Sequence, residues 1–360
     1  MLEAVKGFIN WISAPYYLFT LSVIASILIV AWKGWVRPKI FVGIMILAAA
    51  FFGLSMLDSD FLLIVVKADN IPIAGMLFLV MFFTWLAMKQ AFANDARIAA
   101  GKGPAESEES KDKLLCWPHL VYTEFICLIL VSVVLLVWSI VIQAPIEQPA
   151  NLTDSPNPSK APWYFLGLQE MLVYYDPWIA GVLLPSYIIL GLMAVPYIDK
   201  NPKGNGYYTF KERKWEVGLF LFGFLVLWIL LIILGTFLRG PNWNFFGPYE
   251  YWDIHKVEPL VNIHLSHIMW VKILGQGLPK NMYLREIFGI LATVVYIFVL
   301  PVVLLRWGVF KHFYEKLGGI RYHIFMNLLL VMMSMPIKMY LRWAFNFKYI
   351  VNMPEIFFNI

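Results

Sequence analysis

The sequence predicts an all-α integral membrane protein of about eight transmembrane helices. Of its 360 residues, 61% are hydrophobic and only 14% are charged, whereas soluble domains average roughly 45 to 50% apolar and about 25% charged residues. Apolar runs of about 20 residues recur along the whole chain, and a helix of that length crosses roughly 30 Å of hydrocarbon. The composition therefore argues against a water-soluble fold.

Eight apolar segments support this prediction. They cover residues 11–31, 40–57, 71–92, 121–142, 177–197, 217–237, 287–305 and 324–341. The first is long enough to span and follows a short stretch with Glu3 and Lys6, which favours a retained helix over a cleaved signal peptide. The last is the least regular of the eight because Pro336 and Lys338 fall inside it.

The basic residues orient these segments. If the segments alternate in direction, most of the 28 Lys and Arg residues fall in loops on one side of the membrane. The positive-inside rule makes that side cytoplasmic and places both termini on the periplasmic side. Because the basic residues are spread over several loops, with no single cluster among aromatic residues, we expect the lipid bilayer and no nucleic acid as a partner.

Loop composition divides the chain into regions. We expect a three-helix membrane unit at 1–92, a cytoplasmic linker at 93–117, a helical region at 118–240 with an external loop at 144–176, an external aromatic loop at 241–286, and a two-helix unit with a tail at 287–360. The linker is assigned from its glycines, its proline and an acidic run.

The proline-rich external loop holds the best candidate for chemistry. It reads N-P-S-K-A-P-W-Y-F-L-G-L-Q-E from Asn157 to Glu170. The prolines exclude a regular helix up to Pro162, and the following residues can form a short interfacial helix. Glu170 is a functional candidate because ionisable groups at membrane depth usually have a function. The alternative is an interfacial aromatic belt with a surface carboxylate.

The order of these features resembles a known family. Trp117-Pro118, a helix, the proline-rich loop with P-W-Y-F, a helix closing at V-P-Y, a basic loop and a further helix are similar to the C-terminal half of cytochrome b. The layout is closest to subunit IV of the cytochrome b6f complex and related bacterial split forms, over about residues 115–240. In that family a P-E-W-Y sequence lies beside the quinol-oxidising site, where its glutamate accepts a quinol proton and the Rieske protein docks.

The resemblance implies that Pro162, Trp163, Tyr164, Phe165 and Tyr174 bind quinol. This chain has Pro162 where the family has its glutamate, and proline cannot exchange a proton. Either the site is inactive or another acid serves, because quinol oxidation requires a proton acceptor. We expect that acceptor to be Glu170, about two turns further along the same helix.

The family also has an acidic residue near a second quinone site, just after its Trp-Pro pair. Here the corresponding candidates are His119 and Glu124. Glu124 lies one turn inside an apolar run, so a helix-packing role with a hydrogen-bond partner is an equal alternative.

The histidines and cysteines indicate which redox cofactors we do not expect this chain to bind. No two of its six histidines form a mid-membrane pair at the spacing that the haem-carrying half of cytochrome b uses, and His264 and His267 have no convincing third metal ligand. Two cysteines without a C-x-x-C-H sequence provide neither a covalent c haem nor a four-cysteine cluster. We therefore expect the b haems, the c haem and the Rieske 2Fe-2S cluster on partners: a di-haem cytochrome b6-like subunit, a Rieske iron–sulfur protein and a c-type cytochrome.

Together these features predict a haem-free subunit of a quinol:cytochrome c oxidoreductase in a bacterial cytoplasmic (inner) membrane, not catalytic alone. One alternative is a quinol-handling membrane anchor of another respiratory complex, of the polysulfide-reductase type. A transporter is a further alternative, disfavoured because inverted repeats are not visible and intramembrane charges are scarce.

Overall fold

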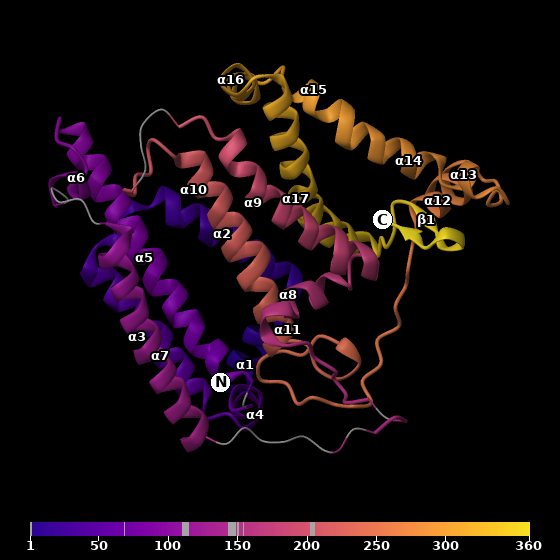
Figure 1. Cartoon of the computed structure of the whole chain (residues 1–360). Coiled ribbons are helices and arrows are strands. Elements are labelled where there is room, and N and C mark those ends of the chain that lie inside the picture. The colour runs from indigo at the N-terminus through magenta and orange to yellow at the C-terminus, as the bar shows by residue number, and fades with distance from the viewer. Residues whose placement is uncertain are drawn as a thin grey trace. The chain divides into compact units, whose positions relative to one another are not determined.

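The structure is a computed structural model that describes residues 2–67, 69–109, 115–142, 149, 151–153, 155–201 and 206–360. Within these ranges the chain is mostly helical, and one two-stranded antiparallel sheet lies near its C-terminal end (Figure 1). Residues 110–114 of the predicted linker and residues 144–148, 150 and 154 of the predicted external loop lie outside the described residues.

The elements follow one another as a series of helices with short breaks. In chain order they are α1 (Leu2–Ile12), α2 (Pro15–Ala31), α3 (Pro38–Ser55), α4 (Ser59–Val65), α5 (Ile71–Ala99), α6 (Ala105–Glu109), α7 (Val121–Val141), α8 (Trp163–Met171), α9 (Leu184–Ile198), α10 (Lys214–Leu221), α11 (Leu230–Phe237), α12 (Leu265–His267), α13 (Met282–Arg285), α14 (Ile287–Val294), α15 (Leu300–Leu304), α16 (Gly308–Leu317), α17 (Gly319–Phe345), β1 (Asn352–Met353) and β2 (Phe358–Asn359). Short π-helical segments lead into α7 and α9, and others join α10 to α11 and α14 to α15.

The predicted number of membrane helices agrees with the described part of the chain. Seven helices there are long and apolar enough to cross a membrane, or up to eight if the bent pair of α1 and α2 forms one span. The first predicted helix is not continuous, because α1 and α2 meet at an angle of 78°. Pro15 begins α2, and a proline is well suited to the first turn of a helix but not to its interior.

One predicted helix end differs clearly from the structure. Helix α5 continues to Ala99, past the expected end at residue 92. Asn94 and Asp95 are polar but buried, because they bond to backbone groups of other segments: Asn94 accepts from the Ala105 amide at 2.9 Å, and Asp95 accepts from the Lys211 amide at 3.0 Å. Side chains that satisfy distant backbone groups allow a helix to extend beyond its apolar run.

The chain divides into two compact units. Unit 1 contains Met1–Leu28, Asn157–Gly204 and Phe220–Ile360, and unit 2 contains Ile29–Pro156 and Asn205–Leu219. In unit 2, the Phe41 ring of α3 stacks on the Trp85 ring of α5 with centroids 4.4 Å apart. No residue of α7 is buried in the structure.

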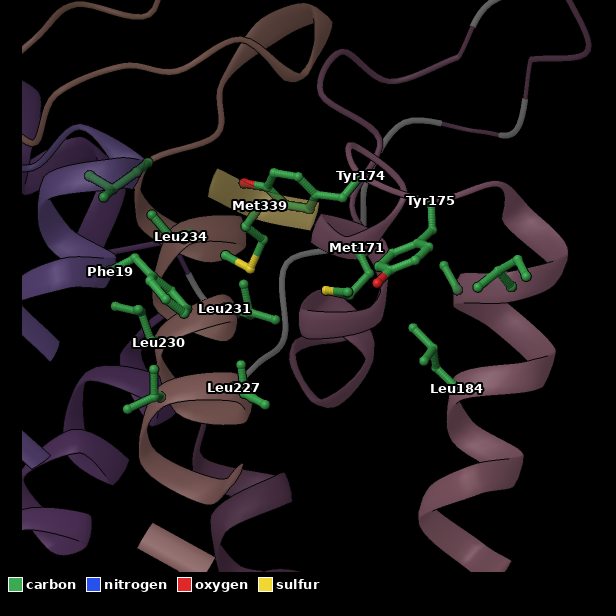
Figure 2. Close-up of a cluster of buried hydrophobic side chains, with 14 residues drawn as sticks. Phe19, Met171, Tyr174, Tyr175, Leu184, Leu227, Leu230, Leu231, Leu234 and Met339 are labelled. Atoms are coloured by element: carbon green, nitrogen blue, oxygen red, sulfur yellow. The ribbon is translucent and has the colours of Figure 1, made fainter. Parts of the chain in front are cut away.

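The core of unit 1 gathers side chains from helices that are far apart in sequence (Figure 2). Phe19, Met171, Tyr174, Leu231 and Met339 are each at most 1% exposed and come from α2, α8 and the turn after it, α11 and α17. Helix α8 packs mainly on α11. This core fixes the short helix α8, which follows the proline-rich loop of the sequence, against α11, part of the candidate span with the highest mean hydropathy in the described part of the chain.

A glycine in α14 permits the C-terminal segment to pack closely, and this generates a prediction. A Cβ atom at Gly289 would collide with the Ile350 carbonyl, whereas a Cβ at Gly43 of α3 meets nothing within 4 Å. We expect Gly289→Ala to destabilise the protein by about 1–3 kcal/mol through overpacking, and Gly43→Ala to be neutral or stabilising because alanine favours helix. Thermal unfolding of both purified variants by tryptophan fluorescence checks this. Equal midpoints for the two variants would contradict the packing.

Candidate functional site

Helix α8 has an exposed start and a buried face further along. It begins at Trp163 because Pro162 can precede a helix but cannot donate within it, and the Phe165 amide donates to the Pro162 carbonyl at 2.8 Å. The buried face comprises Leu166, Gly167, Glu170 and Met171. The predicted quinol-binding residues Pro162, Trp163, Tyr164 and Phe165 lie together at the start of the helix and are exposed.

The buried face of α8 holds an ion pair. Glu170 is fully buried, and Arg239, just after α11, is 8% exposed. Arg239 Nη2 donates to Glu170 Oε1 at 2.6 Å, and Arg239 Nε donates to Glu170 Oε2 at 2.9 Å. Two parallel charge-assisted hydrogen bonds give this pair a fixed geometry and a high strength. The pair therefore joins α8 to the end of α11.

Two aromatic side chains complete the environment of the carboxylate. Trp243 Nε1 donates to Glu170 Oε2 at 3.1 Å, and the Tyr174 hydroxyl donates to Glu170 Oε1 at 3.4 Å. Arg239 Nη1 also donates to the Trp243 carbonyl at 3.1 Å. Each oxygen of Glu170 thus accepts from two donors, and a buried carboxylate with this many donors is fully satisfied.

The segment that presents Trp243 has an unusual backbone. Asn242 and Trp243 have φ angles of 56° and 57°, a left-handed conformation that costs a non-glycine residue about 1–2 kcal/mol. The Asn242 amide donates to Asn157 Oδ1 at 2.8 Å, which ties this segment to the proline-rich loop. Backbone strain of this kind is often found near functional sites.

The proline-rich loop is fastened to the same helices. Gln169 of α8 accepts from the Ala161 amide at 2.8 Å and donates to the Ser159 carbonyl at 2.9 Å. Lys160 Nζ donates to the Thr236 carbonyl of α11 at 2.7 Å, where a cation is favoured by the helix dipole. The loop just before the exposed aromatic residues therefore has a defined path.

The surroundings of the cluster determine the protonation states of Tyr174 and Arg239. Burial raises the pKa of Tyr174, and the Glu170 charge raises it further, so the phenol stays protonated. Burial lowers the pKa of Arg239, but Glu170, together with Tyr174 and Glu258, raises it, and the net pKa lies above the ordinary value. The guanidinium remains a cation.

The sequence did not identify Arg239 or Trp243 as site residues. Arg239 comes directly after an apolar run and opens the aromatic segment, which was the available signal. Tyr174, predicted to bind quinol, is fully buried and belongs to the core of unit 1. His119 and Glu124 lie in unit 2, both exposed, at the start of α7.

No group of three or more His, Cys, Asp and Glu side chains in the described part of the chain is placed to hold a metal. His264 stacks on Tyr349 with ring centroids 5.3 Å apart, and burial lowers its pKa. A neutral, stacked imidazole of this kind fits a packing role.

The buried ion pair yields a prediction about stability. Replacing Glu170 by Gln leaves the buried Arg239 charge without a counter-ion, which costs about 3–5 kcal/mol. The matched control is Glu216→Gln, because Glu216 pairs with Arg213 at 2.9 Å on the surface, where such pairs contribute at most about 1 kcal/mol. Thermal or denaturant unfolding in the same detergent measures both. A Glu170→Gln variant as stable as Glu216→Gln would be inconsistent with a stabilising role for the pair.

Comparison with known proteins identifies a relationship over this part of the chain. Residues 149–249 match the family model described as cytochrome b (C-terminal)/b6/petD. A stretch of 90 residues, 24% of this chain, is 31% identical to cytochrome b of Allochromatium vinosum, and it covers 22% of that protein. No solved structure matches the chain.

The matched range runs from the proline-rich loop through α8, α9, α10 and α11 into the aromatic segment after Arg239. It therefore contains the whole Glu170 cluster. The resemblance predicted for residues 115–240 is confirmed over its later part, whereas α7 precedes the matched range. The chain is a multi-pass membrane protein whose residues 149–249 are similar to the C-terminal part of cytochrome b.

Proposed function

We propose that this chain is a haem-free, cytochrome b-type subunit of a quinol:cytochrome c oxidoreductase of the bc class. In this proposal it forms one wall of the quinol-oxidising pocket and supports proton release on the periplasmic side of a bacterial cytoplasmic membrane. The family match over residues 149–249 supports the class of complex. The match does not extend to most of the relative's length, so the activity is assigned to the whole assembly and not to this chain.

The observation that carries the proposal is helix α8, which has an exposed start and a buried face. Trp163, Tyr164 and Phe165 are 38%, 45% and 50% exposed, whereas Glu170, about two turns further along the helix, is locked in a buried ion pair. Exposed aromatic rings on a rigid element provide an apolar surface of the kind that cofactor and quinone sites use. A second wall from another subunit would close the pocket around a quinol ring.

The remaining redox groups belong to partners in this proposal. A di-haem cytochrome b6-like subunit holds the b haems, a Rieske iron–sulfur protein holds the 2Fe-2S cluster, and a c-type cytochrome holds the c haem. His119 and Glu124 remain candidates for a second quinone site. The proposal also places both termini of the chain on the periplasmic side. These assignments rest on the family resemblance.

The contacts of Glu170 favour a positioning role over the proton-accepting role predicted from the sequence. A proton acceptor needs a lone pair that reaches the substrate. Both Glu170 oxygens are already used by Arg239, Trp243 and Tyr174, and the side chain is fully buried. Proton transfer to Glu170 would require the ion pair to open. Its simplest task in the proposed site is to hold α8 so that Trp163, Tyr164 and Phe165 stay in place.

A double substitution separates the two roles of Glu170. If Glu170 only positions α8, Glu170→Gln lowers quinol:cytochrome c turnover by about tenfold or more, because the site residues are misplaced. Adding Arg239→Gln then restores part of the turnover, because no buried charge is left unpaired. If Glu170 accepts the proton, the double variant turns over as slowly as Glu170→Gln. Both variants then lack the change of turnover with pH that titration of Glu170 produces in the unsubstituted protein. Steady-state turnover between acidic and basic pH, with Glu216→Gln as the control, measures this.

The proposed complex is tested by what purifies with the chain. We expect a tagged chain, extracted in mild detergent, to bring down a di-haem b-type protein and a Rieske protein in equal amounts. Haem absorption spectra and the electron paramagnetic resonance signal of the reduced cluster identify them. A molybdopterin or multihaem partner without a b6-like chain would overturn the proposal in favour of an anchor of the polysulfide-reductase type.

A further inference from the structure

A groove lies at the far end of unit 1 from the Glu170 cluster. Its volume is about 540 Å³. It is lined by residues at the end of α9 and the start of α17, namely Ala194, Pro196, Tyr197, Ile198, Asp199, Ile320, Arg321 and Ile324. The two helices pack side by side (Figure 1), and a Cβ at Gly191 of α9 would contact Leu328 of α17 at 3.8 Å.

The depth of the groove follows from helix geometry. Ile179–Ile198 is a candidate membrane span of 20 residues, and at 1.5 Å per residue such a helix is about 30 Å long, the thickness of the hydrocarbon core. Ile179 belongs to the buried core beside Tyr174 and Tyr175, whereas Ile198 lines the groove. The groove therefore lies at the opposite membrane boundary, where apolar and aqueous surroundings meet.

The lining of the groove has two chemical parts. Tyr197 and Ile320 are 77% and 80% exposed, and Ile324 is 44% exposed, so the walls present a large apolar surface. Arg321 lies on the same wall as Ile320 and Ile324, and its guanidinium makes no hydrogen bond or ion pair within the described part of the chain. Asp199 also lines the groove, but it takes part in another interaction. An anionic ligand would therefore complement the positive charge of Arg321.

We infer that this groove binds a phospholipid, with the phosphate on Arg321 and an acyl chain along Tyr197, Ile320 and Ile324. A guanidinium binds phosphate through paired, charge-assisted hydrogen bonds. The groove falls within the usual size range of ligand sites, and its apolar walls would be left unfilled by a free phosphate ion. The site is independent of the proposed quinol chemistry, because it lies at the other end of the helices.

Native mass spectrometry tests this inference. The purified full-length chain, with any subunits that remain bound to it, is reconstituted in nanodiscs of phosphatidylglycerol and phosphatidylcholine, released, and analysed for retained phosphatidylglycerol. We expect Arg321→Gln to reduce the retained lipid about tenfold, the change produced by about 1.4 kcal/mol. The matched control is Lys316→Gln, which removes an exposed cation of α16 that does not line the groove. Equal retention by the two variants would overturn the inference.

A second variant separates a lipid from a free anion. Ile320→Ser keeps Arg321 and removes part of the apolar wall, so a phospholipid site predicts weaker retention in this variant as well. Undiminished retention in Ile320→Ser, together with displacement of the lipid by millimolar inorganic phosphate, would show a simple anion site and overturn the inference. Thermal unfolding confirms that the variants are folded, as expected for substitutions of exposed residues. The result does not depend on turnover, so it stands or fails separately from the proposed function.

Discussion

The buried pair of Glu170 and Arg239 is the interaction on which the best-defined part of this structure depends. Two opposite charges in an apolar region are costly to bury, and they are stable only when each is fully paired and hydrogen-bonded. Here both carboxylate oxygens are satisfied by Arg239, Trp243 and Tyr174. Since the partners come from the end of α11, the aromatic segment and the turn after α8, one carboxylate organises three separate parts of the chain.

This arrangement explains how a short helix obtains a fixed orientation. Helix α8 has nine residues, and an isolated helix of that length is marginal in water. Its stability comes from tertiary contacts: close packing on α11, where Gly235 lies beneath the Leu166 carbonyl, and the ion pair at its C-terminal end. The exposed aromatic residues at its start then occupy a position that is determined by buried contacts further along the helix.

The sequence was sufficient for features that depend on local pattern. Apolar runs predicted the membrane helices, and Pro162 predicted where α8 begins, because hydrophobic length and proline chemistry act within a few residues. It also singled out Glu170, although as a proton acceptor and not as one half of a buried ion pair. Its partner could not be predicted, since Arg239 is 69 residues away in the chain and ion pairing at that separation depends on tertiary structure. The bend at Pro15 was missed because the apolar run continues through it.

The backbone of Asn242 and Trp243 has a consequence for how the aromatic segment behaves. Two consecutive residues with positive φ store conformational energy that relaxes if nothing holds them. The Trp243 indole is held by the same carboxylate that binds Arg239, and the Asn242 amide is held by Asn157. Two hydrogen bonds therefore hold the segment in this conformation. The conformation depends on the Glu170 cluster, so a substitution at Glu170 would affect the surface loop directly, with no helix movement required.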